Sequence, residues 1–220
     1  MRLGAIIPNF KANTTHGEID FHEWIGDSWC MLFSHPADFT PVCTTELGRI
    51  AVHKNEFCKR NVKICALSCD KLQAHTDWVN DIKSYCRDIP GDFPYPIISD
   101  DTREIAVKLD MLDERDRDNE DTAMTVRALY IIDPEKRLRL SMVYPTSTGR
   151  NVDEILRVID SLQLTDRLKV VATPANWVPG DKIMILPSVK DEDLPKLFPK
   201  GVDKVSMPSG INYVRTTTDY

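Results

Sequence analysis

The stretch FSHPADFTPVC, residues 33–43, decides the fold of this chain. An apolar run at 29–33 leads into it and predicts a buried strand, which ends at a His-Pro turn signal. Thr40 is a favourable N-cap, and Pro41 is a favourable first helical residue because the amide N–H that proline lacks would be unpaired there in any case. The pattern therefore predicts a strand, a short loop and a helix that carries Cys43 in its first turn.

Cys43 occupies a position where a thiolate is favoured over a thiol. Free backbone N–H groups and the positive end of the helix dipole stabilise an anion in the first turn of a helix. Thr40 lies one helical turn before Cys43, so its hydroxyl can approach the sulfur. An isolated cysteine more often packs as a small apolar side chain. A thiolate, helix amides and a hydroxyl together, however, form a pocket for a small polar substrate, and we predict a nucleophilic cysteine.

The pattern P-x-x-x-T-x-x-C formed by Pro36, Thr40 and Cys43, followed by TTE, resembles the peroxidatic motif of the peroxiredoxins. The similarity covers nearly the whole chain and is greatest to the one-Cys, peroxiredoxin six subclass of the AhpC/TSA family. In the two-Cys enzymes a resolving cysteine stands in a V-C-P segment, where this chain has Thr173 and Pro174. The resemblance implies a thioredoxin-like fold. The similar blocks are residues 3–13, 27–29, 34–36, 144–151, 154–165 and 171–177.

The remaining sequence predicts alternating strands and helices, and this order favours a three-layer α/β fold with a mixed central sheet. A βαβ unit is indicated by helical periodicity within 47–58, an apolar strand at 62–68 and a second helical face at 72–82. A hairpin of two strands is expected at 127–143. The other expected elements are a strand at 96–99, a short helix at 103–109 and a helix at 152–162.

We expect two domains, a thioredoxin-like peroxidase domain over residues 1–164 and a small α+β extension over residues 165–220. Six prolines divide the second segment into short pieces, with strand-like runs at 183–186 and around Tyr213. About 55 residues bury too little surface to form a stable core alone. The resemblance implies a dimerisation domain that reaches across a second subunit, so that the enzyme is a homodimer.

The composition is that of an ordinary globular protein, with 220 residues, 42% hydrophobic and 28% charged. The formal net charge is −6 and the basic residues are scattered among acids, so a nucleic-acid partner is not expected. The N-terminal segment lacks a signal-peptide core, and no run approaches the roughly 20 apolar residues of a membrane span. We expect a cytoplasmic protein and leave contact with a membrane surface open.

The cysteines are expected to be reduced, because no secretory signal precedes them. Apart from Cys43, four of them are expected to be packing residues: Cys30, Cys58, Cys65 and Cys69. Cys86 ends the second helical face. A zinc site that combines cysteines with His53 or His75 lacks paired ligand spacing, so neither a metal nor another cofactor is expected.

The resemblance implies partners for Cys43. An arginine at a strand start is usually a surface charge, yet the similar enzymes place Arg127 against the sulfur, where its charge favours the thiolate and its donors can hold a peroxide oxygen. Glu46 and Arg150 resemble the companion pair that orients this arginine, although a plain helix acid and a loop cation remain the alternative. His35 either hydrogen-bonds near the site or serves a structural role.

The expected reaction is the reduction of a hydroperoxide. The Cys43 thiolate attacks one oxygen, the O–O bond breaks, and the leaving oxygen is stabilised by Thr40, Arg127 and the helix amides. The sulfur becomes a sulfenic acid. Because no resolving cysteine is recognised, an external thiol should reduce it. The resemblance implies glutathione, delivered by a glutathione transferase.

Two alternatives remain open. The segment GDSWC at 26–30 resembles the G-x-S-x-G of one-Cys relatives credited with phospholipase A2 activity, and His22 matches their histidine. Cys30 replaces the second glycine, Glu135 stands for the aspartate, and a nucleophile elbow needs a strand before a helix, whereas here a loop precedes a strand. A turn role for Ser28 is therefore favoured. The other alternative is a non-catalytic holdase or scaffold, which peroxide consumption would distinguish from an enzyme.

Overall fold

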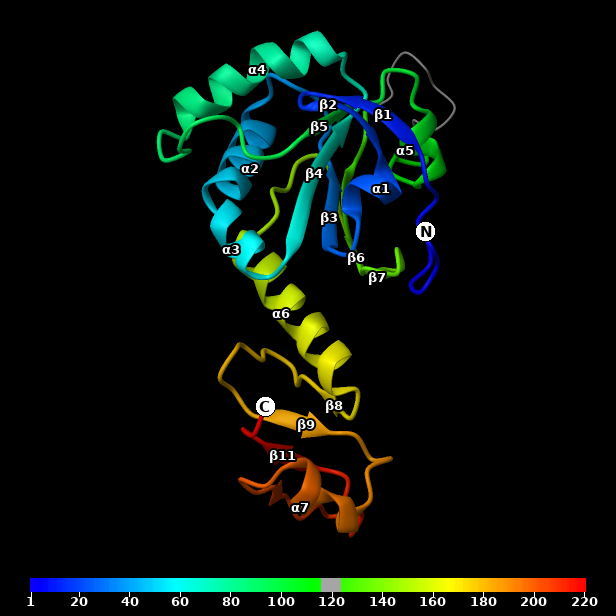
Figure 1. Cartoon of the computed structure of the whole chain (residues 1–220), viewed down its shortest axis with the longest axis vertical. Helices are drawn as coiled ribbons and strands as arrows, with labels where there is room; N and C mark the ends of the chain where they lie inside the picture. Colours follow the sequence, from blue (N-terminus) through cyan, green and yellow to red (C-terminus); the bar gives the residue numbers. More distant parts are fainter. Residues whose placement is uncertain (116–123) are drawn as a thin grey trace. The chain divides into compact units, whose positions relative to one another are not determined.

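The computed structural model describes residues 1–115 and 124–220, and the chain divides into two compact units, residues 1–152 and 153–220 (Figure 1). The first unit is built on a seven-stranded mixed sheet. Its strands are β1 (Lys11–Thr14), β2 (Gly17–Asp20), β3 (Trp29–Ser34), β4 (Val62–Ser68), β5 (Ile97–Ser99), β6 (Arg127–Ile132) and β7 (Leu138–Tyr144). They lie in the order β2-β1-β5-β4-β3-β6-β7, with β3, β4 and β5 parallel and the other pairings antiparallel.

Helices lie on both sides of this sheet, with α2 and α4 on one side and α1 and α5 on the other (Figure 1). All six residues of β3 are buried. A strand covered on both faces needs a continuous apolar run, and this explains why the sequence around β3 does not alternate. The mixed α/β fold class is confirmed. The helices are α1 (Phe21–Ile25), α2 (Pro41–Val52), α3 (Lys54–Lys59), α4 (Leu72–Tyr85) and α5 (Glu104–Lys108).

The helical structure expected within 47–58 is present but divided between α2 and α3, because the helix is interrupted at His53. The N–H of His53 bonds to the carbonyls of Arg49 and Ile50, and this tightens the end of α2 before α3 begins. On α3 the buried side chain is Phe57. Cys58 is exposed, so the expectation that it is a packing residue is wrong. Cys30 and Cys65 are buried as expected.

The second unit has its own small core and a four-stranded antiparallel sheet, in the order β10-β11-β9-β8. The expected α+β extension is thus present. Helix α6 (Val152–Leu168) runs beyond the expected end at 162 and falls almost wholly in this unit. The expected domain boundary after residue 164 lies within this helix and stays a prediction. The other elements are β8 (Val171–Ala172), β9 (Ile183–Ile185), a 3₁₀ turn η1 (Asp191–Asp193), α7 (Leu194–Leu197), β10 (Asp203–Lys204) and β11 (Arg215–Thr217).

Within residues 1–115 and 124–220, no helix has the length and apolar character needed to span a bilayer.

Candidate active site

Cys43 lies in the first turn of α2, as the sequence predicts, and its side chain is fully buried. Thr40 is the N-cap residue and Pro41 the first helical residue. The Thr40 hydroxyl makes no capping bond. It donates its hydrogen to the carbonyl of Ala37 at 2.8 Å. The expectation that Thr40 donates a hydrogen bond to the leaving oxygen is therefore wrong. Its hydroxyl hydrogen is already bound to Ala37, so its oxygen is free to act as an acceptor.

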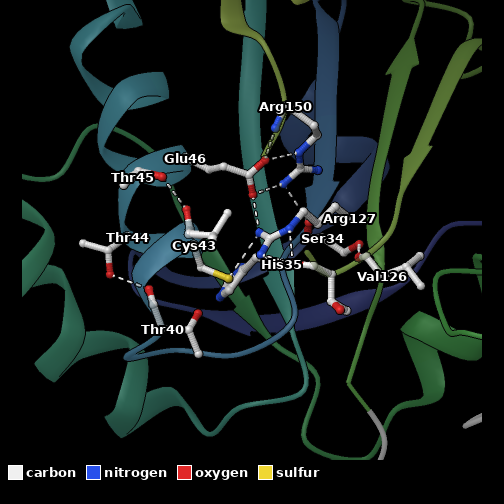
Figure 2. A network of polar contacts seen from close by, with 12 residues as sticks. Ser34, His35, Thr40, Cys43, Thr44, Thr45, Glu46, Val126, Arg127 and Arg150 are labelled. Atoms are coloured by element: carbon white, nitrogen blue, oxygen red, sulfur yellow. Dashed lines mark hydrogen bonds and ion pairs between the residues drawn. The ribbon is translucent and has the colours of Figure 1, made fainter. Parts of the chain in front are cut away.

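Arg127 begins β6 and points at the sulfur. Its Nη1 lies 3.4 Å from Cys43 Sγ and 2.5 Å from Glu46 Oε2, so the guanidinium joins the sulfur to a carboxylate (Figure 2). Its Nε and Nη2 donate to the carbonyl of Thr146 at 2.9 and 2.6 Å. The side chain is buried, which excludes the surface-charge alternative. A fixed cation that donates to sulfur stabilises the thiolate over the thiol.

Glu46 is the centre of a buried charge network, one helical turn beyond Cys43. Besides Arg127 it accepts bonds from the Arg150 backbone N–H at 2.7 Å, from Nε at 2.8 Å and from Nη2 at 3.0 Å (Figure 2). Burial is the strongest influence on the Glu46 pKa and raises it. The hydrogen bonds and charge of Arg150, with the charge of Arg127, outweigh burial and hold that pKa below its usual range. Glu46 is therefore ionised and fixes both arginines.

Arg150 also binds the sheet. Its Nη1 donates to the carbonyl of Ala128 in β6 at 2.8 Å, and its Nη2 donates to the carbonyl of Ser34 at the end of β3 at 2.9 Å. The Ser34 hydroxyl donates to the Val126 carbonyl at 2.5 Å. These bonds hold the loop before α2 against the start of β6. Ser34 was not among the predicted site residues, and its signals were its place at the end of the strand and within the similar block at 34–36.

His35 and Pro36 are both buried in the loop between β3 and α2. His35 Nε2 lies 2.8 Å from Asp38 Oδ1, and the other Asp38 oxygen lies 2.6 Å from His75 Nδ1. The sequence analysis missed Asp38 and His75. Asp38 stands three residues after His35, and this spacing was the one available signal.

The ligand-type atoms of His35, Asp38 and His75 lie within 4.8 Å of one another, close enough to suggest a metal site. Two ligands of a tetrahedral zinc ion stand about 3.3 Å apart, given zinc–nitrogen distances of about 2.0–2.1 Å. The nitrogen–oxygen distances of 2.8 and 2.6 Å are shorter than this. These are hydrogen-bond distances, and the three side chains therefore form a hydrogen-bonded cluster.

The residues of the alternative lipase site have separate partners. The Ser28 hydroxyl donates to Asn61 Oδ1 at 3.1 Å, and His22 Nε2 lies 2.7 Å from the Ile7 carbonyl. Gly26 caps α1, and β3 begins directly after Ser28. The order of loop and then strand is the reverse of a nucleophile elbow. The geometry favours the turn role of Ser28.

Selective alkylation of Cys43 is the first prediction. Burial raises the pKa of Cys30, Cys65 and Cys86, and it raises the pKa of Cys69 to about 12, so these thiols are poor nucleophiles near pH 7. Cys43 instead has Arg127 beside it. Brief treatment with substoichiometric iodoacetamide, followed by peptide mass spectrometry, should find most of the label on Cys43. Uniform labelling of the cysteines would contradict this.

The second prediction concerns the source of that reactivity. Arg127→Met removes the cation and hydrogen-bond donor beside the sulfur and should slow alkylation of Cys43 about tenfold. The rate is measured at neutral pH from the loss of unmodified Cys43 peptide. Arg49→Met on the exposed side of α2 is the matched control and should keep the original rate. Equal rates in the two variants would contradict a direct effect of Arg127.

Comparison with known proteins gives consistent matches. The sequence matches the AhpC/TSA family over residues 3–141 and the C-terminal domain of 1-Cys peroxiredoxin over residues 161–201. It is 55% identical to Peroxiredoxin-6 of Gallus gallus and 53% identical to that of Homo sapiens, in each case over 98% of this chain and 96% of the relative.

Two solved structures are similar over almost the whole chain. A cysteine-to-serine mutant of the peroxiredoxin 6 of Arenicola marina has a TM-score of 0.94 and 51% identity, and the match covers 100% of this chain and 99% of that one. The yeast mitochondrial 1-Cys peroxiredoxin, studied for thiol resolution through glutathione/thioredoxin systems, has a TM-score of 0.87 and 42% identity, with 99% of both chains covered. The thioredoxin-like form of the sheet expected from the sequence is thereby confirmed.

Proposed function

The chain belongs to the AhpC/TSA family and carries the C-terminal domain of its 1-Cys peroxiredoxins, and on that premise we propose how it works as a thiol-dependent peroxidase. Cys43 is the residue that attacks hydrogen peroxide and organic hydroperoxides. The observation that carries this proposal is the buried Arg127 donor 3.4 Å from the Cys43 sulfur. A thiolate beside a fixed cation is an activated nucleophile.

In the first half-reaction an S–O bond forms as the O–O bond breaks. The Cys43 thiolate supplies the electron pair, and the departing oxygen leaves as hydroxide or alkoxide and takes up a proton. Arg127 is positioned to donate to this oxygen as its charge develops. The Thr40 oxygen, whose own hydrogen is bound by Ala37, accepts the hydrogen of the incoming hydroperoxide. Cys43 is left as a sulfenic acid.

In the second half-reaction an external thiol restores Cys43. One thiol attacks the sulfenic sulfur, forming a mixed disulfide with Cys43 and releasing water. A second thiol then attacks the external sulfur of this mixed disulfide, so that the Cys43 thiolate leaves and the two external thiols depart as a disulfide. Thr173, at the expected resolving position, is hydrogen-bonded to Ser161 at 2.6 Å. We propose glutathione as the reductant, with a glutathione transferase as its partner. The yeast mitochondrial 1-Cys peroxiredoxin, whose thiol resolution proceeds through glutathione/thioredoxin systems, supports glutathione or thioredoxin for this step.

A hollow of about 480 Å³ beside the active loop supports organic hydroperoxides as substrates. Its lining is mainly apolar and includes residues on both sides of Cys43 in the sequence. Phe39 and Tyr85 are exposed there, so an alkyl group could cover apolar surface now facing water. The main lining residues are Phe39, Thr40, Pro41, Thr44, Trp78 and Tyr85.

The proposed function is tested by peroxide consumption. Purified protein with excess glutathione or dithiothreitol should remove hydrogen peroxide faster than the thiol alone. When reductant is withheld, a sulfenic-acid trap such as dimedone should label Cys43. Consumption no faster than the thiol background, with no trapped sulfenic acid, would overturn the proposal. Addition of a glutathione transferase separates the reductant question, because only turnover with glutathione should rise.

The third prediction is that oxidation does not crosslink the protein. Cys30 is buried in β3, and the Cys86 sulfur is packed so closely over α2 that a Cβ placed at Gly48 would collide with it. Neither can reach Cys43 without local unfolding. Peroxide-treated protein should therefore gain oxygen atoms on Cys43, up to the sulfinic acid, and should not lose two hydrogens to an intramolecular disulfide. It should also run as a monomer on a non-reducing denaturing gel. A disulfide-linked dimer that is lost in Cys86→Ser would contradict the one-Cys mechanism.

We propose a cytoplasmic homodimer. Among the described strands, β7 has one neighbour, β6. On the other edge of β7, Leu138 bonds to Gly4 and Ala5, and the rest of that edge is open to pairing. Val143 on this strand is 61% exposed, which supports a contact with a second copy. Sedimentation of Val143→Asp tests the interface, since a dimer built on this edge should weaken.

The cytoplasmic location is supported by the cysteines, which are free thiols.

A further inference from the structure

The active loop is attached to α4 by a buried chain of three titratable side chains that the reaction above does not use. His35 and His75 are fully buried and Asp38 is 7% exposed. Each Asp38 oxygen faces one ring nitrogen, His35 Nε2 at 2.8 Å and His75 Nδ1 at 2.6 Å. The second nitrogen of His75 lies 3.1 Å from the carbonyl of Ile98 in β5.

The protons on His35, Asp38 and His75 can be assigned from the hydrogen-bond acceptors around them. A carbonyl oxygen has no hydrogen, so His75 Nε2 must donate to Ile98. If the Asp38 carboxylate is ionised, it accepts at both oxygens, and His75 Nδ1 must carry a hydrogen as well. His75 is then an imidazolium. His35 donates through Nε2, and its Nδ1, which has no hydrogen-bond partner among the described residues, is left without a hydrogen.

The electrostatics agree with a neutral His35 and an ionised Asp38. Burial is the strongest influence on the Asp38 pKa and raises it, but hydrogen bonds from His35 and His75 outweigh burial and hold that pKa below its usual value. Burial also lowers the pKa of His35, against the opposite effect of Asp38. A neutral His35 and an ionised Asp38 then need one positive partner, because an isolated buried charge is costly.

The three hydrogen-bonded side chains anchor a strained turn. Phe39, directly after Asp38, has a φ of +53°, a left-handed conformation that a bulky residue adopts only when its surroundings impose it. The next residue, Thr40, is the N-cap of the helix that carries Cys43. The Asp38 backbone N–H is held as well, by Asp70 Oδ2 at 3.0 Å. Asp38 thus fixes the turn through both its backbone and its side chain.

Helix α4 also contacts the other side of Cys43. Trp78 lies one helical turn beyond His75, on the same face. Its ring centroid is 5.1 Å from that of His35, and its Nε1 donates to the Thr44 hydroxyl at 3.1 Å. Thr44 directly follows Cys43, so α4 contacts the residues that precede and follow the nucleophile.

We infer that His75 is a positioning residue for the peroxidase reaction, a buried imidazolium that, through Asp38, holds the strained turn at Phe39 and so keeps the first turn of α2 in its reactive arrangement. This inference rests on the proposed role of Cys43. Its tests therefore include measurements that do not depend on turnover.

The first test measures the ring protons directly. Long-range ¹H–¹⁵N correlation spectra of the full-length protein at neutral pH, assigned with His35→Asn and His75→Asn, should show both nitrogens of His75 protonated. The same spectra should show His35 protonated at Nε2 alone. A His75 ring with one protonated nitrogen would overturn the inference, whether or not the protein is a peroxidase.

The second test separates positioning from folding. His75→Leu removes both hydrogen bonds, whereas His75→Asn can still donate to Asp38. The leucine variant should lower both the rate of Cys43 alkylation and kcat/KM for hydrogen peroxide about tenfold or more. The asparagine variant should recover part of the loss, because it restores a hydrogen bond to Asp38 but not the positive charge. Gln73→Ala, exposed on the same helix, is the control. Circular dichroism establishes that each variant is folded.

Three outcomes are distinguishable. Rescue by asparagine supports the inference. Unchanged alkylation of Cys43 in a folded His75→Leu protein overturns it. If His75→Leu slows alkylation but the unsubstituted protein consumes no peroxide, the positioning role is supported and the proposed peroxidase function is overturned. If His75→Leu does not fold, the ring-proton spectra of the unsubstituted protein decide the question.

Discussion

Cys43→Ser is expected to lower kcat/KM for hydrogen peroxide by at least about 10³-fold, because the residue that forms the covalent bond is lost. A serine hydroxyl has almost the same shape as the thiol and leaves the Arg127–Glu46 pair in place. It is not ionised near neutral pH, so it cannot supply the electron pair that breaks the O–O bond. The measurement is initial-rate peroxide consumption with a thiol reductant in excess.

Cys58→Ser is the matched control, since Cys58 is exposed on α3 and no bond among the described residues joins it to the site network. It should retain the original rate. If Cys43→Ser consumes peroxide as fast as the unsubstituted protein, the sulfur has no part in turnover. The holdase or scaffold hypothesis would then explain the fold better than catalysis. If both variants lose activity equally, a general sensitivity to cysteine replacement would be responsible.

The part of the site that the sequence predicts correctly is the part built from local signals. The apolar run of β3, the N-cap Thr40 and the first-turn Pro41 lie within a few residues of Cys43, and each acts through its immediate neighbours. Such effects can be deduced from spacing alone. The position of Cys43 in the first turn of α2 follows directly from them.

The arginine network could not be derived in this way. Arg127 is 84 residues from Cys43 in sequence, and its approach depends on the antiparallel pairing of β6 with β3, in which Leu129 faces Phe33. Nothing local encodes that register. The resemblance to a family supplied Arg127 and Arg150 as candidates. The same reason explains why His75, which reaches Asp38 from α4, was missed.

The N-terminal elements were missed for another reason. Strands β1 and β2 have four residues each, and their sequences KANT and GEID carry little apolar alternation. Side-chain bonds stabilise the hairpin instead, with the Thr14 hydroxyl donating to the Gly17 carbonyl at 2.7 Å. Hydrophobic periodicity cannot detect a hairpin of this kind.

Glu46→Ala is expected to destabilise the folded protein by about 3–5 kcal/mol, the usual cost of removing one partner from a buried ion pair. The substitution leaves Arg127 and Arg150 buried with uncompensated charge, and it removes the acceptor of four hydrogen bonds. A loss of this size is a large fraction of the roughly 5–15 kcal/mol that stabilises a typical domain. Urea unfolding at pH 7 measures it. Glu56→Ala is the control, because Glu56 forms exposed ion pairs with Lys59 and Arg60 that contribute little.

The pH dependence of that difference identifies its cause. The pKa of Glu46 is lower in the folded protein than in the unfolded chain, so its contribution is fully present above the ordinary glutamate pKa of about 4.3. It is lost as the pH falls through the lower folded value, because protonation then removes the charge that Arg127 and Arg150 bind. The gap in unfolding free energy between the unsubstituted protein and Glu46→Ala should therefore narrow in acid. If this difference in unfolding free energy stays constant from pH 7 to below the ordinary glutamate pKa, the alanine substitution acts through lost packing. Arg127, which faces Cys43, would then be held by Thr146 without help from Glu46.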